Sequence, residues 1–276
     1  MKMMRFLDDT GRARYGVPTA GRRARPIFGD LFEDFAVSDK EVAVLKSLPP
    51  VDPPNIFAIG LNYKRHADET GASYPDHPLI FIKATTSLAA PGAPIILPAE
   101  APDEVDYEAE LAIIIRKTCK HVQEKDVDDV VLGYTCANDV SARDCQKRLD
   151  KQWARAKSFD TFCPLGPVVV TPDEIDADNV PVRSILNDQV MQDSNTNDMI
   201  FSTRFLVSYL SRQFTLQPGT VILTGTPSGV GMARKPEVYL RDGDTITVEL
   251  GGIGRLTNPV VAEHRHHPAA VSVGPE

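Results

Sequence analysis

The stretch VDYEAELAIIIRK, residues 105–117, contains the pattern that decides the fold. Alternate side chains of a strand point to opposite faces, so Asp106, Glu108 and Glu110 are expected to share one face. The apolar run at 111–115 has no polar position, which predicts burial on both sides. The stretch therefore predicts a central strand with carboxylates where it enters the core.

Strand patterns dominate the chain on both sides of this stretch. They lie at 55–62, 79–84, 94–98, 107–116, 130–139, 166–171, 220–226 and 245–250. Many of the 22 prolines and 18 glycines fall between them, as turns require. Helical patterns are fewer and lie at 123–131, 141–156 and 202–214; the second has an apolar stripe of Cys145, Leu149 and Trp153. We predict an α+β, β-rich fold with a few peripheral helices, without regular βαβ alternation.

Residues 1–50 are expected to form a small N-terminal module. A hairpin with an Asp-Thr-Gly turn is predicted over 5–17, and a short helix over 38–48, where Ser38 and Glu41 fit a capping box. PPVDPPN at 49–55 has four prolines in seven residues, which predicts a stiff connector. The second domain, residues 51–276, is expected to contain the functional site.

Composition narrows the class of protein. The 276 residues are 42% hydrophobic and 25% charged, which is typical of a globular protein. The sequence has no apolar run of the ~20 residues that a membrane helix needs and no signal-peptide core, so we predict a cytoplasmic protein. A net charge of −8 argues against a nucleic-acid partner. The cysteines lack CxxC spacing and are expected to be reduced, mostly buried thiols: Cys119, Cys136, Cys145 and Cys163.

Three carboxylates are candidates for a metal site. Glu108 and Glu110 are one strand step apart, and Asp139 ends the next long strand pattern. Each has an alternative interpretation: the glutamates as acidic residues on an exposed strand edge, and Asp139 as a helix N-cap. As an all-oxygen set they favour Mg²⁺ or Mn²⁺ over zinc and leave coordination positions for water and substrate.

Four further residues are candidates for binding a ligand. Lys157 follows the second predicted helix, and Arg143 and Gln146 lie one turn apart within it. Thr226 lies in a glycine-rich loop after a buried strand, where a hydroxyl can approach a ligand oxygen. The alternatives are a helix-end cation, exposed helical side chains and a plain turn.

His66 and Glu69 are the candidate catalytic pair, in FAIGLNYKRHADET at 57–70. At i, i+3 spacing they face the same way on a helical turn. A carboxylate bound to one imidazole nitrogen fixes the tautomer and leaves the other nitrogen free to accept a proton. The alternative is a solvated first turn of a helix.

Six motifs occur here in the same order as in the fumarylacetoacetate hydrolase family, which the chain resembles over about residues 55–260. They are GLNYKRHADE, FIKATTSL, DYEAELAIII, GYTCANDVSARD, QWARAKSFDTFCPLGP and ILTGTPSGVG. The resemblance implies a mixed β-sandwich or roll and a homodimer. It also implies Mg²⁺ or Mn²⁺ held by Glu108, Glu110 and Asp139. The other residues that match family positions are His66 and Glu69 on a mobile lid, Lys157, Arg143, Gln146, Thr226 and, behind the metal ligands, Lys83.

The resemblance and the residues together predict a metal-dependent hydrolase. We expect cleavage of a C–C bond in an acylpyruvate or 2,4-diketo acid through a metal-stabilised pyruvate enolate, with His66 activating water and Lys157 stabilising charge. An oxaloacetate-type decarboxylase and a 2-hydroxyhepta-2,4-diene-1,7-dioate-type isomerase or tautomerase remain alternatives, because they use the same enolate. A non-catalytic metal-binding protein or scaffold is a further alternative. The lid is placed near 70–79, His77 is expected on the surface, and 263–276 is expected to be a loosely ordered tail.

Overall fold

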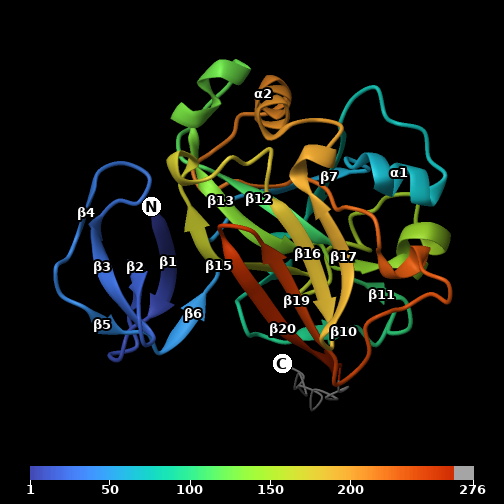
Figure 1. Ribbon diagram of the computed structural model, residues 1–276, viewed down its shortest axis with the longest axis horizontal. Helices are drawn as coiled ribbons and strands as arrows, with labels where there is room; N and C mark the ends of the chain where they lie inside the picture. Colours follow the sequence, from blue (N-terminus) through green and yellow to red (C-terminus); the bar gives the residue numbers. More distant parts are fainter. Residues whose placement is uncertain (264–276) are drawn as a thin grey trace, which may run out of the picture.

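The computed structural model describes residues 1–263, and Figure 1 shows its strands arranged in packed sheets with few helices. The predicted tail lies outside the described residues, apart from Glu263. The main sheet has the strand order β4-β3-β2-β1-β15-β13-β12-β18-β7-β8, and β5, β6 and β9 pair at its side. Its strands are β1 (Lys2–Leu7), β2 (Ala13–Thr19), β3 (Arg23–Gly29), β4 (Phe35–Val37), β5 (Val42–Ala43), β6 (Lys46–Leu48), β7 (Ile56–Gly60), β8 (Leu79–Lys83), β9 (Leu88–Ala89), β12 (Ala109–Ile115), β13 (Val131–Asn138), β15 (Cys163–Val170) and β18 (Val221–Leu223).

A second sheet of five strands packs against the main one. Its order is β10-β20-β19-β16-β17, and a two-stranded pair, β11 with β14, lies apart from both. The strands are β10 (Ile95–Leu97), β11 (Val105–Asp106), β14 (Ser141–Ala142), β16 (Pro181–Leu186), β17 (Gln189–Asn195), β19 (Thr245–Leu250) and β20 (Gly254–Ala262). The two α-helices are α1 (Lys64–Thr70) and α2 (Thr203–Gln213). The fold is therefore α+β and β-rich, as predicted.

Strand β12 lies between two hydrophobic clusters, which explains its sequence. Leu111 and Ile113 face a cluster that includes residues of the second sheet and of α2. Ala112 and Ile114 face the opposite cluster, which includes Met3 and other residues of the N-terminal strands. Every residue of β12 is buried. The apolar run predicted to be covered on both sides is confirmed.

All eight predicted strand patterns contain strands, but several further strands were not predicted, and three of them lie in the second sheet. Two of these, β16 and β17, form a hairpin around Asn187 and Asp188, which both have positive φ. Asx residues accept this left-handed conformation, so the Asn-Asp pair was a usable hairpin signal. The third, β20, contains Pro259, a residue that weakens a strand prediction.

One predicted helix is wrong, and a second is confirmed only over residues 143–149. Residues 38–48 form the short strands β5 and β6, because β6 pairs with β1 through Arg5 and Leu48, and this pairing outweighs the capping signal. Residues 141–156 begin as strand β14 and continue as a π-helical turn, Cys145–Leu149, followed by irregular turns. Leu149, part of the predicted apolar stripe, is 63% exposed. By contrast, the helix predicted at 202–214 is confirmed as α2, and 123–131 contains a 3₁₀ helix, Glu124–Asp129.

The N-terminal strands form a separate lobe in Figure 1, although the pairing of β1 with β15 makes them part of the main sheet. The hairpin of β1 and β2 is confirmed, and β1 pairs with β15 through Lys2 with Val170 and Met3 with Val169. The proline-rich stretch 49–55 has no helix or strand. All four cysteines are free thiols and buried, as predicted.

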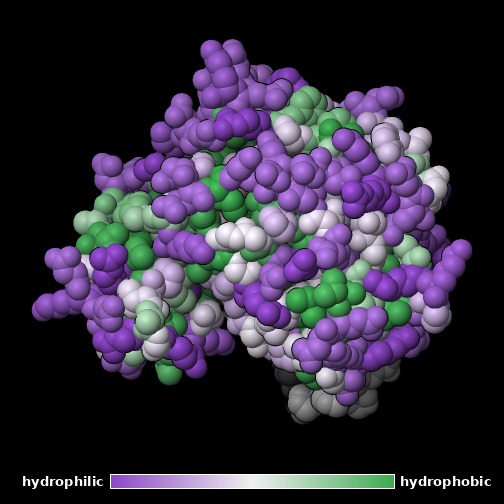
Figure 2. Space-filling model, in the orientation of Figure 1, coloured by the Kyte–Doolittle hydropathy of each residue, from purple (hydrophilic) through white to green (hydrophobic). Residues whose placement is uncertain are grey.

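The face shown in Figure 2 is mainly hydrophilic, with smaller hydrophobic areas between the polar side chains. Among residues 1–263, no helix is both long enough and apolar enough to cross a bilayer.

Candidate active site

Strands β12 and β13 bring three carboxylates together, which we call the carboxylate cluster: Glu108, Glu110 and Asp139. The antiparallel register pairs Ala109 with Asn138, and the amide of Asp139 donates to the carbonyl of Glu108 at 2.9 Å. Each residue of the cluster offers an oxygen within 4.8 Å of the others, and all three are buried. The structure thus brings together the predicted metal ligands, and Asp139 is not a helix N-cap.

Three buried cations surround the carboxylate cluster. Lys157 Nζ donates to Glu108 Oε2 and to Asp139 Oδ2, both at 2.7 Å. Lys83 Nζ lies 2.6 Å from Asp139 Oδ1. Arg143 Nη2 lies 2.8 Å from Glu108 Oε1, an ion-pair distance without hydrogen-bond geometry. These cations are part of the site, so Lys157 is neither a surface residue nor a helix-end cation.

Glu110 is the carboxylate of the cluster that has no ion pair within the described residues. Its Oε2 accepts from the Gly225 amide at 2.7 Å, where a φ of +100° turns the backbone toward the carboxylate. Burial, followed by the charges of Asp139 and Glu108, raises the pKa of Glu110 well above its ordinary value. For Glu108, although burial opposes ionisation, Lys157 and Arg143 lower the pKa. A buried carboxylate that faces two others and has no cation of its own fits a divalent metal ion.

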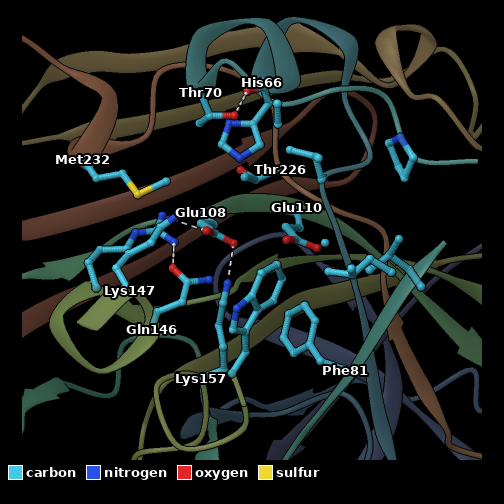
Figure 3. A pocket seen from close by; sticks show the side chains of 18 residues that line it. His66, Thr70, Phe81, Glu108, Glu110, Gln146, Lys147, Lys157, Thr226 and Met232 are labelled. Carbon is cyan, nitrogen blue, oxygen red and sulfur yellow. Dashed lines mark hydrogen bonds and ion pairs between the residues drawn. The ribbon is translucent and has the colours of Figure 1, made fainter. Parts of the chain in front are cut away.

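The pair His66 and Glu69 lies on α1, and Figure 3 shows His66 at the opposite side of the pocket from Lys157. His66 Nδ1 is 2.7 Å from Glu69 Oε1. An ionised carboxylate can only accept, so the neutral imidazole carries its proton on Nδ1 and presents the lone pair of Nε2. The second oxygen, Oε2, accepts from the Gly229 amide at 2.8 Å. His66 is 7% exposed, which excludes a solvated helical turn.

Arg143 and Gln146 contact each other within the short helical stretch at 143–149. Arg143 Nη1 donates to Gln146 Oε1 at 2.9 Å, and Arg143 Nε donates to Asp106 Oδ2 at 2.9 Å. The Nε2 amide group of Gln146 has no hydrogen bond within residues 1–263, so it is available to a ligand oxygen. Thr226 donates its hydroxyl proton to the Ala109 carbonyl at 3.0 Å and accepts from Gln192 Nε2 at 2.8 Å, so it has no proton left for a ligand oxygen.

These side chains line one pocket of about 300 Å³. Its polar residues lie beside an apolar wall that includes Ile59, Leu79, Phe81 and Trp153. The predicted lid contributes Thr70, Ala72 and Pro75 to the lining, whereas the exposed His77 is not among the lining residues.

Sequence reasoning missed several residues of the site. Trp153 was placed on a helical stripe, but it packs edge-on against Phe81 with ring centroids 5.5 Å apart. Asp106 was placed on the acidic face without a role; its Oδ1 accepts from the Gly231 amide at 2.7 Å, so it joins Arg143 to the glycine-rich loop. Lys147 also lines the pocket, and no sequence signal distinguished it from an exposed lysine.

Comparison with known proteins agrees with this fold. The family model described as fumarylacetoacetate (FAA) hydrolase C-terminal matches residues 55–261. Oxaloacetate tautomerase fahd2, mitochondrial, from Xenopus laevis is 48% identical over 215 residues, which are 77% of this chain and 67% of that protein.

Two solved structures are similar over almost the whole chain. The crystal structure of 5-carboxymethyl-2-hydroxymuconate delta-isomerase from Mycobacterium smegmatis has a TM-score of 0.84 and 39% identity, and covers 95% of this chain and 100% of that one. Maleylpyruvate hydrolase from Sphingobium sp. SYK-6, solved with manganese(II) and pyruvate, has a TM-score of 0.74 and 30% identity, and covers 96% and 100%. The chain belongs to the fumarylacetoacetate hydrolase family.

Proposed function

We propose that this protein is a divalent-metal-dependent enzyme that interconverts the keto and enol forms of an oxaloacetate-like 2-oxo acid. The observation that carries the proposal is the 2.7 Å contact between His66 Nδ1 and Glu69 Oε1, because His66 lines the same pocket as Glu108 and Glu110 of the carboxylate cluster. It provides a base directed at the place where a metal-bound 2-oxo acid would lie.

His66 is the proton carrier in this proposal. Its Nε2 takes a proton from C3 of the keto form, and the C–H electron pair becomes the C2=C3 double bond. The negative charge moves to the 2-oxo oxygen, and return of a proton to that oxygen gives the enol. Glu69 holds the imidazole in the accepting tautomer and stabilises the imidazolium that forms.

Lys157 and Gln146 supply donors to the substrate. A lysine ammonium has three N–H groups, and two of those of Lys157 are used by Glu108 and Asp139. The third is available to the oxygen on which charge develops. The Nε2 group of Gln146 is available to the substrate carboxylate, and Arg143 fixes its orientation through Gln146 Oε1.

The charges of the site are consistent with one divalent cation and an anionic substrate. When ionised, the carboxylate cluster and Asp106 carry four negative charges, against three positive charges on Lys83, Arg143 and Lys157. A divalent ion would reverse the remaining negative charge, which favours binding of a carboxylate. Held by the carboxylate cluster, Mg²⁺ or Mn²⁺ would supply Lewis-acid polarisation of the 2-oxo group.

The names of the relatives favour the isomerising alternative over the hydrolytic expectation. Several proteins that are 44–48% identical are named oxaloacetate tautomerases, and a structure at 39% identity is named an isomerase. Hydrolysis of an acylpyruvate is the second candidate, because the maleylpyruvate hydrolase was solved with manganese(II) and pyruvate. Homodimer formation, cytoplasmic location and a domain boundary near residue 51 remain predictions from the sequence.

Ultraviolet absorbance of the oxaloacetate enol tests the proposal directly. With Mg²⁺ or Mn²⁺ we expect loss of the enol faster than in buffer, no such acceleration after chelation, and a roughly 10²- to 10⁴-fold lower rate in His66→Ala. His77→Ala, a change at an exposed histidine outside the pocket lining, is expected to match the wild type.

The same preparations are assayed for pyruvate release from acetylpyruvate and from oxaloacetate. If hydrolysis is rapid and tautomerisation does not exceed the buffer rate, the hydrolytic candidate replaces the proposal. A wild-type tautomerisation rate in His66→Ala would exclude His66 as the base.

A further inference from the structure

Three cationic side chains line the pocket, and two of them are already paired. Arg143 contacts Asp106 and Glu108, and Lys157 contacts Glu108 and Asp139. The third, Lys147, is exposed and has no ion pair or hydrogen bond with any residue in the described range 1–263. It is therefore the cation of the pocket lining that is free to meet a new anion.

Lys147 lies where a second negative group of a substrate would have to go. It follows Gln146 on the π-helical turn, and Figure 3 shows both side chains on the same side of the pocket as Met232, with Phe81 on the other side. The wall around Phe81 also contains Leu79 and is apolar, so a carboxylate placed there would lose hydration without gaining a partner.

The electrostatic surroundings of Lys147 agree with this position. Burial and the positive charge of Arg143 lower the pKa of Lys147. Glu108 acts in the opposite direction and Lys157 in the same direction as Arg143. Two of the three charged neighbours that shift this pKa are therefore positive, and an anionic ligand would offset their repulsion.

We infer that Lys147 is a specificity-determining residue that binds the distal carboxylate of a 2-oxo dicarboxylate. The inference rests on the proposed function, because it assumes that the 2-oxo acid end lies at the carboxylate cluster and Gln146. The distal carboxylate then lies on the Lys147 side of the pocket, and a substrate with a methyl group in its place loses this contact. Lys147 provides no group to the proton transfer itself.

Oxaloacetate and 2-oxobutyrate test the inference because they have chains of equal length and differ in the distal group, a carboxylate or a methyl. Binding is followed by the fluorescence of Trp153, the single tryptophan of the chain, which lines the same pocket. The kcat/KM for enolisation is measured in parallel as proton exchange at C3. The variants are Lys147→Met, Lys147→Arg and, as a control, Lys151→Met at an exposed lysine outside the pocket lining.

For Lys147→Met we expect about tenfold weaker binding and lower kcat/KM with oxaloacetate, the effect of losing one charge-assisted hydrogen bond. With 2-oxobutyrate both quantities should stay within about twofold. Lys147→Arg should retain most of the preference for oxaloacetate, because it keeps the charge. Raising the ionic strength should weaken oxaloacetate binding in the wild type more than in Lys147→Met, since salt screens the ion pair.

Equal losses for both acids in Lys147→Met, or an equal loss in Lys151→Met, would overturn the inference. So would an unchanged preference for oxaloacetate in Lys147→Met. Failure of the proposed function is distinguishable, because it would appear as wild-type protein that binds 2-oxo acids without enolising them. The binding preference would still decide the role of Lys147.

Discussion

Glu69→Gln tests whether Glu69 orients His66, because the carboxylate accepts hydrogen bonds from two donors at once. One oxygen is 2.7 Å from His66 Nδ1 and the other accepts from the Gly229 amide at 2.8 Å. A glutamine has one accepting oxygen and one NH₂ group, so it can satisfy only one of the two donors. With its oxygen on His66, the NH₂ group faces the Gly229 N–H. With its NH₂ group on His66, the imidazole is forced into the tautomer that cannot accept a proton at Nε2.

The magnitude follows from the loss of at least one hydrogen bond to a charged group. Such bonds contribute about 1.5–3 kcal/mol, so we expect kcat to fall roughly 10- to 150-fold in Glu69→Gln. Glu69→Ala removes both contacts and should be slower still. The rise in Tm on adding Mg²⁺ or Mn²⁺ should be unchanged in both variants, because Glu69 is not part of the carboxylate cluster.

Enol loss from oxaloacetate provides the assay, and Asp68→Asn provides the matched control. Asp68 is the adjacent acid on α1, is exposed, and accepts one hydrogen bond, from Tyr74 at 3.0 Å. Its replacement should leave kcat within about twofold. A wild-type kcat in Glu69→Gln, with metal binding intact, would refute the assignment of Glu69 as the residue that orients His66.

Three other predictions concern the metal site, acid stability and the loop behind the site. Glu110→Gln should raise Tm in the absence of metal, since it removes a carboxyl group whose ionisation is opposed by burial and by the charges of Asp139 and Glu108. It should also abolish the rise in Tm on adding Mg²⁺ or Mn²⁺, whereas Glu100→Gln should keep that rise. A full rise in Glu110→Gln would contradict the metal site. The side chain of Arg14 holds the pKa of Asp8 below its ordinary range, so Asp8 stabilises the fold above the unfolded-state pKa near 4, and this stability is lost as pH falls toward the folded-state pKa. Urea unfolding should therefore show Asp8→Asn destabilised at pH 7 and closer to wild type at about pH 3. An equal difference in stability at both pH values would exclude this role of Asp8. Gly231→Ala places a methyl group 1.9 Å from a backbone carbonyl oxygen, so urea unfolding should show that the free energy of unfolding falls by about 1–3 kcal/mol. An unchanged free energy of unfolding would show that the loop shifts freely.

The local part of the site could be predicted because its signals are short in sequence. The spacing of His66 and Glu69 requires only one helical turn, and α1 provides it. The alternation from Glu108 to Glu110 requires only extended backbone where β12 begins. Both patterns depend on backbone periodicities that do not change with tertiary context.

Residues 141–157 show where local reasoning failed. The apolar spacing of Cys145, Leu149 and Trp153 predicts a helix, but Ser141 and Ala142 pair with β11 and the guanidinium of Arg143 is held by Asp106. Long-range hydrogen bonds and ion pairs outweighed the local helical pattern, and they bend the segment so that Trp153 lines the pocket instead of a helix face.

The sequence by itself determined the strand content, the carboxylates of the central strand and the histidine–glutamate pair, because each depends on the order of side chains along one element. Only the tertiary structure decided that Asp139 lies beside Glu108, that Lys83 and Lys157 neutralise these acids, and that Lys147 has no anionic partner among residues 1–263. These relations join residues that are tens of positions apart, and they are set by the register of β12 with β13 and by the energetic need to pair buried charges.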